Sequence, residues 1–378
     1  MRAAVTRSRG SGFEIAELNI DCPRDHEVLV AIMASGLCHS DWDFANSDFG
    51  QTFPTVLGHE IAGVVQAVGP HVTQIAPGDH VVGCTVASCG ACEHCMMGNR
   101  LHCLNPTVGS RRAGDPPRLS ESGATVAQAF GLGGFADHAV IHESQLVAVD
   151  SAIPFDKAAV LGCSVATGGG VVLRSARVQP MESVVILGAG GVGLNAIQVS
   201  ALVGARKVIA IDVDDSKLKL ARTFGATHVV NSKSEDAVER ISRITGGRGV
   251  DHAFEMSGLP GPLDQGMAML GRHGTMYVVG LQHTGTTVDF PAAVGDGLTM
   301  RFEHAVRGVK MGSTNFKIDV PYYAELYMQG RLNLDDLVTD TISLDQINKG
   351  FARMHSGETA GRTVITFESK NTEKGSIV

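Results

Sequence analysis

Apolar residues in the first part of the chain come in short runs that glycine, proline and aspartate interrupt. Such runs occupy residues 27–32, 61–65 and 80–82. Short apolar runs bounded by turn-forming residues are typical of strands in a barrel or a sandwich. Residues 104–134 are polar and show no clear periodicity, which predicts an unusually long loop.

The pattern changes near residue 166 to an alternation of apolar strands with helix-like segments. Strands are expected at residues 184–187, 208–211, 228–230, 252–255 and 276–279, and helices at residues 195–203, 217–224, 237–245 and 262–270. Regular alternation of strand and helix predicts a doubly wound parallel sheet, and therefore an α/β fold. A mixed pattern returns after residue 311 and closes in an apolar run at residues 362–367.

Composition and charge narrow the class of protein. At about 150 residues per domain, a chain of 378 residues corresponds to roughly two to three domains. Apolar residues make up 44% and charged residues 19%, which excludes disorder as the main state. The formal charge is −8 with no long basic run, so no nucleic-acid partner is expected. No secretory signal or membrane span is expected either, and the default location is cytoplasmic.

A glycine-rich motif lies between the first strand and the first helix of the α/β region. It consists of Gly188, Ala189, Gly190, Gly191, Val192 and Gly193. In this context Gly188 allows a tight turn, Gly190 lets the backbone approach a pyrophosphate, and Gly193 lets helix and strand pack closely. The N-terminus of the helix would then bind the phosphates. A turn that serves packing alone is the alternative.

Aspartates after the second strand indicate which dinucleotide is bound. Asp212 ends that strand, where a carboxylate accepts hydrogen bonds from the ribose hydroxyls. Together with Asp214 and Asp215 it would repel a 2′-phosphate, so NAD is favoured over NADP.

Four of the eight cysteines lie close together in the sequence, as Cys89, Cys92, Cys95 and Cys103. Four thiolates at short spacings form a closed tetrahedral zinc site. An iron–sulfur cluster would favour a shorter final spacing followed by proline, but Leu104 follows here. Unrelated buried or redox-active cysteines are the alternative. His94 and His102 are expected at the surface, because four thiolates already fill the zinc shell.

A second set of potential metal ligands is dispersed along the chain. It comprises Cys38 with the following His39, Ser40 and Asp41, then His59 with Glu60, and finally Cys163. A catalytic zinc needs three protein ligands and one open position. Spacing alone does not unite these segments, and buried small residues with a core histidine explain them equally well.

The run Gly58-His59-Glu60, with Gly63, Gly69 and Val72, resembles the signature of the zinc-containing medium-chain alcohol dehydrogenases. The resemblance extends over nearly the whole chain, from the four cysteines through the glycine-rich motif to Gly361-Arg362-Thr363. It implies a GroES-like β-rich catalytic domain at residues 1–165 and 312–378, with a Rossmann domain inserted at residues 166–311. It also implies two Zn²⁺ ions per chain, NAD, and a homodimer formed through the Rossmann domain, or a homotetramer.

The resemblance assigns roles to individual residues. Cys38, His59 and Cys163 match the catalytic zinc ligands, Asp41 the acid that holds the other histidine nitrogen, and Glu60 the carboxylate beneath the zinc. Ser40 matches the hydroxyl that contacts the substrate oxygen and accepts its proton. At the coenzyme, His39 and Arg362 match residues beside the pyrophosphate. Asp212 and Lys217 match residues beside the ribose, and Leu281 is also expected to contact the coenzyme. The implied reaction is hydride transfer from a zinc-activated alcohol to NAD.

The long segment after Cys103 resembles the long-loop branch of the family, which contains the liver-type and the formaldehyde-dehydrogenase-like enzymes. Formaldehyde–thiol adducts are recognised in that branch by an acidic residue and an arginine, whose positions hold Phe49 and Thr107 here. Arg111 and Arg112 lie near, so a glutathione- or mycothiol-type adduct is retained as the alternative substrate. A non-catalytic zinc and NAD protein, and a zinc-free quinone reductase, are alternatives from other classes.

The residues expected around the substrate favour a bulky apolar primary alcohol, either aromatic or terpenoid. Thr85 and Ser40 are smaller than the residues that relatives usually have there, while Phe49, Phe130 and Leu281 supply apolar walls.

Asp43 stands where liver-type relatives have a histidine that releases the proton to water. A carboxylate is a weaker base than histidine at neutral pH. Asp43 is therefore either a relay group or a solvated loop acid, with His39 or water as the other route.

Overall fold

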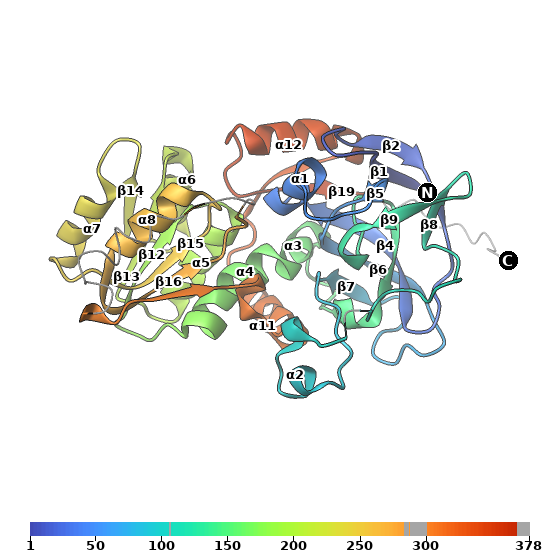
Figure 1. Cartoon of the computed structure of the whole chain (residues 1–378), viewed down its shortest axis with the longest axis horizontal. Coiled ribbons are helices and arrows are strands. Elements are labelled where there is room, and N and C mark those ends of the chain that lie inside the picture. Colours follow the sequence, from blue (N-terminus) through green and yellow to red (C-terminus); the bar gives the residue numbers. More distant parts are fainter. Residues whose placement is uncertain (106, 283–286, 288–300, 369–378) are drawn as a thin grey trace. The chain divides into compact units, whose positions relative to one another are not determined.

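The computed structural model describes all residues except 106, 283–286, 288–300 and 369–378, and the chain forms two compact units (Figure 1). The first unit contains Met1–Gly162, Asp340–Glu358 and Thr363–Val378, and the second contains Cys163–Thr339 and Thr359–Arg362. The second boundary expected from the sequence was therefore misplaced, because residues 312–339 group with the second unit. The reason is packing: helix α11 (Phe316–Met328) contacts α4 (Ser164–Gly170).

The first unit is built on two β-sheets. One has the order β2-β1-β5-β9-β8-β3, formed by Glu14–Glu17, Arg2–Thr6, Thr55–Val56, Ala124–Gln128, Leu119–Glu121 and Asn19–Ile20. The other has the order β11-β7-β6-β4-β19-β18, formed by Leu146–Ala148, His80–Gly83, Glu60–Val68, Glu27–Gly36, Arg362–Thr366 and Val338–Ile342, and β10 (His138–His142) also pairs with β4. The three strands predicted from the early apolar runs are confirmed as parts of β4, β6 and β7.

The expected long loop at residues 104–134 is only partly a loop. Strands β8 and β9 lie within it and form an antiparallel pair. Leu119 and Val126 face each other across this pair and are almost completely buried, at 1% and 3% exposure. The segment was missed because two short strands with few apolar residues leave too weak an alternation to detect.

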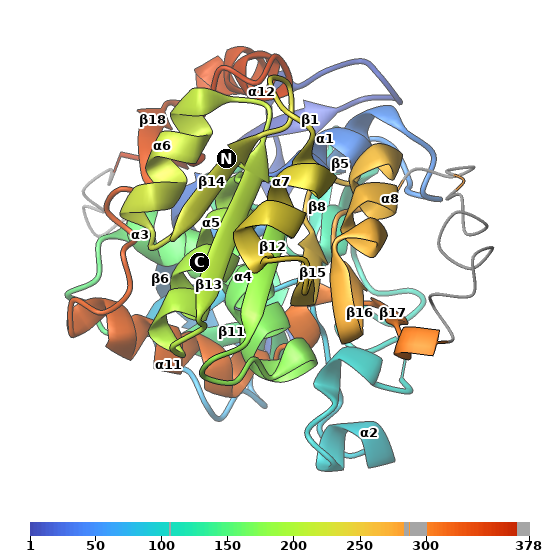
Figure 2. The same cartoon turned by 90° about the vertical axis from the view of Figure 1, so that its left-hand side faces the viewer.

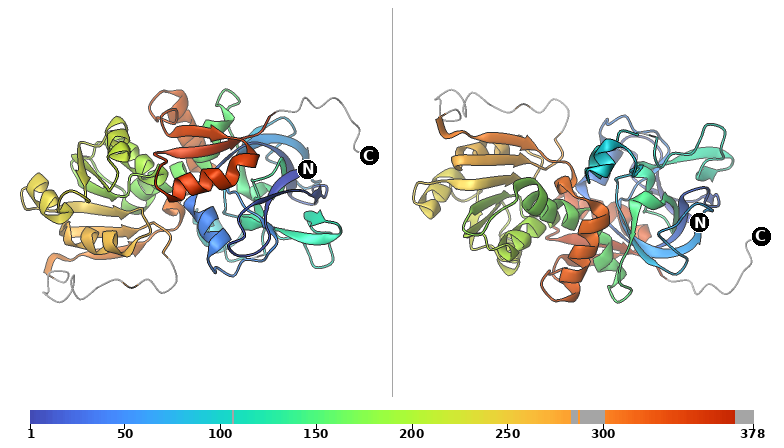
Figure 3. Two further views of the ribbon diagram at one scale, coloured as in Figure 1. Left: turned by 90° about the horizontal axis from the view of Figure 1, so that it is seen from above. Right: turned by 90° about the horizontal axis from the view of Figure 1, so that it is seen from below.

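The second unit is a parallel sheet with the strand order of a Rossmann fold (Figure 2). The order is β14-β13-β12-β15-β16-β17, formed by His228–Asn231, Lys207–Asp212, Ser183–Leu187, Val250–Glu255, Leu270–Val278 and Ala305–Gly308. Helices α5 (Gly191–Leu202), α6 (Asp215–Thr223), α7 (Ala237–Thr245) and α8 (Pro260–Ala268) cover its two faces (Figure 3). The doubly wound sheet is thus confirmed, with β17 as a strand that the sequence pattern did not predict.

Helix α4 and the π-helical segment Val171–Ala176 were also not predicted. Consecutive glycines at 168–170 give this region a poor helix propensity. In the structure a Cβ atom on Gly168 would collide with the carbonyl of Val192, and one on Gly170 with the carbonyl of Gly312. Close backbone packing therefore requires these glycines, and it stabilises the helix despite their low helix propensity.

Among the described residues, no single helix has the length and apolar content to cross a bilayer. One bent pair of helical segments, Phe155–Gly162 with Ser164–Ala176, has the length and apolar composition of such a span.

Candidate metal and coenzyme sites

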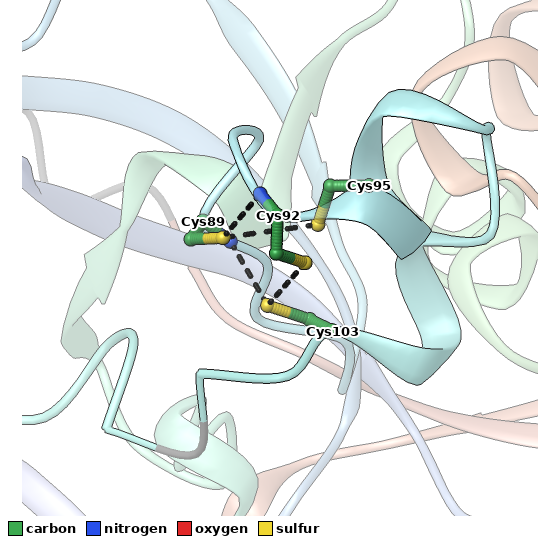
Figure 4. Close-up of side chains that lie close together, drawn as sticks. All are labelled: Cys89, Cys92, Cys95 and Cys103. Carbon is green, nitrogen blue, oxygen red and sulfur yellow. Dashed lines mark hydrogen bonds between the residues drawn. The ribbon is translucent and has the colours of Figure 1, made fainter.

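The cysteine lobe comprises Cys89, Cys92, Cys95 and Cys103, carried by α2 (Glu93–Met96), the 3₁₀ turn Arg100–His102 and the loops around them (Figure 4). Their sulfur atoms all lie within 4.8 Å of one another, and both the Cys89–Cys95 and the Cys92–Cys103 sulfur distances are 4.0 Å. Four thiolates around a tetrahedral Zn²⁺ lie about 3.8 Å apart, so the donor set and its spacing fit zinc. His102 is exposed as expected, whereas His94 is half-buried rather than at the surface.

Backbone amides surround the sulfur atoms of the cysteine lobe. The amide of Cys92 donates to the sulfur of Cys89 at 3.3 Å, and the amide of Leu104 donates to that of Cys92 at 3.5 Å. Such donors stabilise the thiolate, and they lower the pKa of Cys92 to about 6. Burial instead raises the pKa of Cys95 to about 12, so this thiol depends most on a cation for its ionisation.

A second group, here called the buried group, consists of Cys38, His59, Glu60 and Cys163. Its ligand atoms also lie within 4.8 Å of one another, and the four residues are between 0% and 6% exposed. The structure thus brings together the three sequence segments that spacing alone did not connect. The two thiols and the imidazole supply the three protein ligands of a catalytic zinc, and the Glu60 carboxylate lies beside them.

Strand pairing explains how the buried group assembles. Strands β4 and β6 are antiparallel, with Gly36 opposite Glu60, so that Cys38 just beyond β4 lies near His59 just before β6. A Cβ atom on Gly36 would collide with the side chain of Glu60, which explains the glycine. Cys163 directly follows Gly162, where a Cβ atom would collide with a carbonyl of β7, so the first unit fixes the chain at this point.

Asp41 orients the histidine of the buried group. Its Oδ1 lies 2.9 Å from Nδ1 of His59 and accepts the amide of Gly58 at 3.0 Å, and its side chain is completely buried. Burial raises the pKa of Asp41, against the attraction of His59. Burial lowers the pKa of His59, but Asp41 and Cys38 together outweigh burial, so that the pKa of His59 is raised. A carboxylate on the second histidine nitrogen is the arrangement found around metal-ligating histidines.

A row of aromatic rings leads to the buried group. Phe49 stacks on Phe44 with ring centroids 4.8 Å apart, Phe44 meets Phe130 edge-on at 4.6 Å, and Phe130 meets His59 edge-on at 5.3 Å. Phe130 adopts a left-handed backbone conformation with φ 55°, which is rare for a bulky residue, and its carbonyl accepts the side-chain amide of Gln145 at 2.8 Å. Sequence reasoning proposed Phe49 and Phe130 but missed Phe44, because only the helix α1 (His39–Asn46) places that ring between them.

The other residues expected near the substrate occupy varied surroundings. Ser40 and Asp43 are half-buried on α1, and His39 is the exposed first residue of that helix. Thr85 is half-buried just beyond β7. Leu281 belongs to the second unit and is 38% exposed.

Arg111 is engaged within the protein. Its guanidinium pairs with Asp21 at 2.5 Å and with Glu27 at 2.7 Å, and its side chain is only 10% exposed. Arg118 also pairs with Glu27, at 2.7 Å. Arg111 therefore anchors the segment after the cysteine lobe to the start of β4. Arg112, by contrast, is exposed. The sequence did not reveal this use, because Glu27 lies far away along the chain.

The glycine-rich motif has the geometry of a phosphate-binding turn. Gly188 has φ +101°, a conformation that favours glycine, and a Cβ atom on Gly193 would collide with the carbonyl of Gly188. Packing therefore explains these two glycines. A Cβ atom on Gly190, by contrast, would meet no protein atom within 4 Å. Packing does not require a glycine there, whereas the close approach of a pyrophosphate does, so the motif fits a dinucleotide.

Charged side chains flank this turn within the second unit. Arg362 is 4% exposed and lies against Gly191, where a Cβ atom would collide with its guanidinium. Asp212 accepts the amide of Ala189 at 2.8 Å through Oδ2, which ties the turn to the end of β13. Asp214 caps α6 by accepting the amide of Ser216 at 2.7 Å. Its side chain thus caps the helix, and its repulsion of a 2′-phosphate stays a prediction.

Glu255 is a buried acid that the sequence analysis missed. It ends β15 with 0% exposure and accepts the amides of Ser257 at 2.5 Å and Gly258 at 2.9 Å. Its other oxygen accepts the side-chain amide of Gln282 at 3.2 Å, so one carboxylate joins the loops after β15 and β16. Burial raises the pKa of Glu255. Because β15 also holds Asp251 and His252, polarity alone did not single out Glu255; the signal was its position at the carboxyl end of a predicted strand.

Comparison with known proteins gives consistent matches. Residues 24–151 match the model of the alcohol dehydrogenase GroES-like domain, and residues 191–326 that of the zinc-binding dehydrogenases. The chain is 35% identical to the NDMA-dependent alcohol dehydrogenase of Amycolatopsis methanolica (94% of this chain, 96% of the relative). It is 34% identical to the S-(hydroxymethyl)glutathione dehydrogenase of Paracoccus denitrificans (96% and 99%). Benzyl alcohol dehydrogenase from Acinetobacter calcoaceticus has a similar structure, with a TM-score of 0.87, 36% identity and coverage of 97% and 99%.

Proposed function

Since the chain belongs to the zinc-containing medium-chain alcohol dehydrogenases, we propose that it interconverts a bulky apolar primary alcohol and its aldehyde with NAD. The aromatic row of Phe49, Phe44 and Phe130, which ends on His59, carries this proposal. Aromatic walls favour an aromatic or terpenoid substrate, because they gain contact area and ring packing that a two-carbon alcohol cannot provide. The structural similarity to a benzyl alcohol dehydrogenase supports the same substrate class.

The protein would hold two Zn²⁺ ions, one in the cysteine lobe and one in the buried group. When bound, the second Zn²⁺ supplies a Lewis acid that lowers the pKa of an alcohol, and NAD accepts the hydride. Cys38 and Cys163 would balance the charge of the dication, while Asp41 keeps His59 in one tautomer and orientation. Ser40 would take the proton of the alcohol.

The route of the proton beyond Ser40 is the least constrained part of the proposal. We place Asp43 on it, because this half-buried acid lies on the same helix as Ser40. The Asp43→Asn variant should lose kcat near neutral pH with little change in coenzyme affinity, measured from pH 6 to pH 10. A profile that superimposes on that of the unmodified protein would leave His39 or water as the route.

The preference for NAD would depend on Asp212. Its carboxylate lies at the end of β13 beside the glycine-rich turn, where it would accept the ribose hydroxyls and repel a 2′-phosphate. The double change Asp212→Gly with Val213→Arg should raise kcat/KM with NADP relative to NAD. Higher kcat/KM with NADP in the unmodified protein would contradict this assignment.

A substrate panel tests the whole proposal. Benzyl alcohol, geraniol, ethanol and S-(hydroxymethyl)glutathione would each be assayed with NAD, with NADP, and with NDMA added. We expect kcat/KM for benzyl alcohol to exceed that for ethanol by at least about 10-fold. Equal or better use of ethanol would refute the bulky pocket, and better use of the glutathione adduct would favour the activity named for the Paracoccus relative. No turnover of any alcohol would favour a non-catalytic zinc and NAD protein.

A second copy of the chain is the partner we propose. Strand β17 is the last strand of the parallel sheet, and all four of its residues are exposed. An exposed edge strand pairs readily with another strand. Light scattering should give the mass of a dimer or a tetramer, and a monomer would contradict this interface.

A further inference from the structure

Three imidazole rings gather in the first unit at the end of β4 that is remote from the buried group. His26 precedes β4, His142 ends β10, and His71 follows β6. The ring centroid of His26 lies 5.6 Å from that of His71 and 5.8 Å from that of His142. At about 3.3 Å per residue, β4 separates this cluster from Cys38 by about 30 Å. The cluster is therefore distinct from the sites described above.

Two of the three histidines have a carboxylate on Nδ1. Nδ1 of His26 lies 2.6 Å from Oε1 of Glu143, and Nδ1 of His71 lies 3.2 Å from Oδ1 of Asp25. In the neutral ring this contact keeps the proton on Nδ1 and leaves the lone pair on Nε2 for a metal. The same relationship links Asp41 to His59 in the buried group.

The separation of the His26 and His71 rings suits a shared metal ion. With metal–nitrogen bonds of about 2.0–2.1 Å and tetrahedral angles, two imidazole centroids on one ion lie about 5 Å apart. The observed centroid distance of 5.6 Å is close to that value. Both side chains are accessible, at 51% and 62% exposure, so that an ion can enter without opening of the fold.

Backbone contacts hold the two histidines in place. The amide of Glu143 donates to the carbonyl of His26 at 2.8 Å, and the amide of His71 donates to that of Asp25 at 3.0 Å. Glu143 also accepts the amide of Thr73 at 3.2 Å. Asp25 adopts a left-handed conformation with φ 42°, which is unfavourable for a residue other than glycine unless its surroundings hold it.

His142 is a neighbour of this pair rather than a ligand. Its Nδ1 accepts the amide of Ser144 at 3.1 Å, so the proton of the neutral ring is on Nε2. Burial, with His26 adding to it, lowers the pKa of His142, so this ring adds no positive charge beside a cation. The nearby Arg118 and Glu27 pair with each other. Arg111 pairs with Glu27 as well, so these guanidiniums are engaged with carboxylates of their own, whereas the carboxylates in contact with the two rings are Glu143 and Asp25, which favour a cation.

We propose that His26 and His71 form a surface site for one divalent transition-metal ion, namely Ni²⁺, Cu²⁺ or Zn²⁺, in addition to the two cysteine-containing sites. The ligands would be the two Nε2 atoms, with water in the remaining positions, and Glu143 and Asp25 would orient the rings. Imidazole ligands suit these three ions, and Cu²⁺ would bind most tightly of them. A bound ion would also connect the segment before β4 with the loop after β6.

Calorimetric titration of the zinc-loaded full-length protein with Ni²⁺ tests the site. We expect one Ni²⁺ per chain with no loss of zinc, as determined by mass spectrometry of the metal content. The His26→Gln and His71→Gln variants should each weaken binding by at least about 10-fold, and Glu143→Gln by about 10-fold through the orientation of His26. All of these residues lie outside the proposed catalytic machinery, so alcohol oxidation should be unchanged and its failure would be a separate result.

His273→Gln is the matched control. Nδ1 of His273 also lies 3.0 Å from a carboxylate, that of Glu303, and its side chain is 75% exposed. In the part of the chain that the structure describes, it has no ring contact with another histidine, so this variant should bind Ni²⁺ like the unmodified protein. The proposal is overturned if the unmodified protein binds no additional Ni²⁺, if Ni²⁺ displaces zinc instead, or if His26→Gln and His71→Gln bind as the control does.

Discussion

The cysteine lobe and the buried group both hold their ligand atoms within 4.8 Å of one another, but different parts of the fold position these atoms. The lobe takes its ligands from one stretch of chain, two short helical turns and loops, and three of its four cysteines are half-exposed. The buried group takes its ligands from three segments fixed by strand pairing, and none of them exceeds 6% exposure. We therefore expect the lobe to depend on a metal for its shape, whereas the sheet holds the buried group in place without one, so that a metal there would serve the chemistry.

The largest expected effect is the loss of turnover when one ligand of the buried group is replaced. Cys163→Ser should lower kcat for benzyl alcohol by about 1000-fold, because several kcal/mol of Lewis-acid stabilisation are lost. Thermal unfolding should be nearly unchanged, since strand pairing holds the site, and the zinc content should fall by one ion per chain. Cys84→Ser, a change at a buried cysteine outside both sites, is the control. An active Cys163→Ser protein would show that the buried group is not catalytic.

The lobe should show the opposite pattern. Cys95→Ser is expected to lower the free energy of unfolding by several kcal/mol, because a structural zinc contributes its binding energy to folding. Chemical denaturation would be compared with that of Cys22→Ser, in which an exposed thiol outside both sites is changed. If the two variants unfold alike, the lobe does not need its metal and the contrast between the sites fails.

Asp41 allows a finer test of the buried group. Asp41→Asn retains an acceptor for the amide of Gly58 but loses the charge beside His59. Zinc affinity at this site and kcat/KM should fall by about 10- to 100-fold, whereas the lobe should retain its zinc. Asp48→Asn changes an exposed acid nearby and should have no effect on either quantity. Equal zinc loss from both sites would mean that Asp41 acts on overall folding.

The smallest expected effect concerns the aromatic row. Phe130→Leu should lower the ratio of kcat/KM for benzyl alcohol to that for ethanol by about 5- to 10-fold, through loss of ring packing near His59. Phe155→Leu, which changes a ring stacked on His80, should keep the ratio. An unchanged ratio in Phe130→Leu would remove the main support for the proposed substrate class.

The two regions also differ in how far the sequence alone determines them. The cysteine lobe was predictable from spacing, because its ligands lie on one segment and the chain between them is too short to separate them. The buried group was not, since only the pairing of β4 with β6 brings Cys38 near His59, and it was proposed through family resemblance. The Rossmann sheet, except for β17, followed from periodicity, because each of the other strands contains a short apolar run and helices intervene regularly.

What the sequence concealed depends on contacts between distant residues. The sequence left Arg111 as a candidate contact for a thiol adduct. In the structure its guanidinium pairs with Asp21 and Glu27 instead. Phe44 carries no signal of its own and belongs to the aromatic row only because α1 turns it towards Phe130. Both cases show that residue type gives the chemistry available at a position, whereas tertiary contacts decide whether that chemistry is used within the protein or offered to a ligand.

The left-handed backbone at Phe130 opposes the stability of the fold to the specificity for the substrate. Holding a bulky residue in this conformation costs about 1 kcal/mol or more, which glycine would avoid. Selection for heat tolerance alone would therefore accept glycine at position 130, and the ring beside His59 would disappear with the strain. Engineering of this protein for process stability should thus keep position 130 fixed and seek its gains elsewhere.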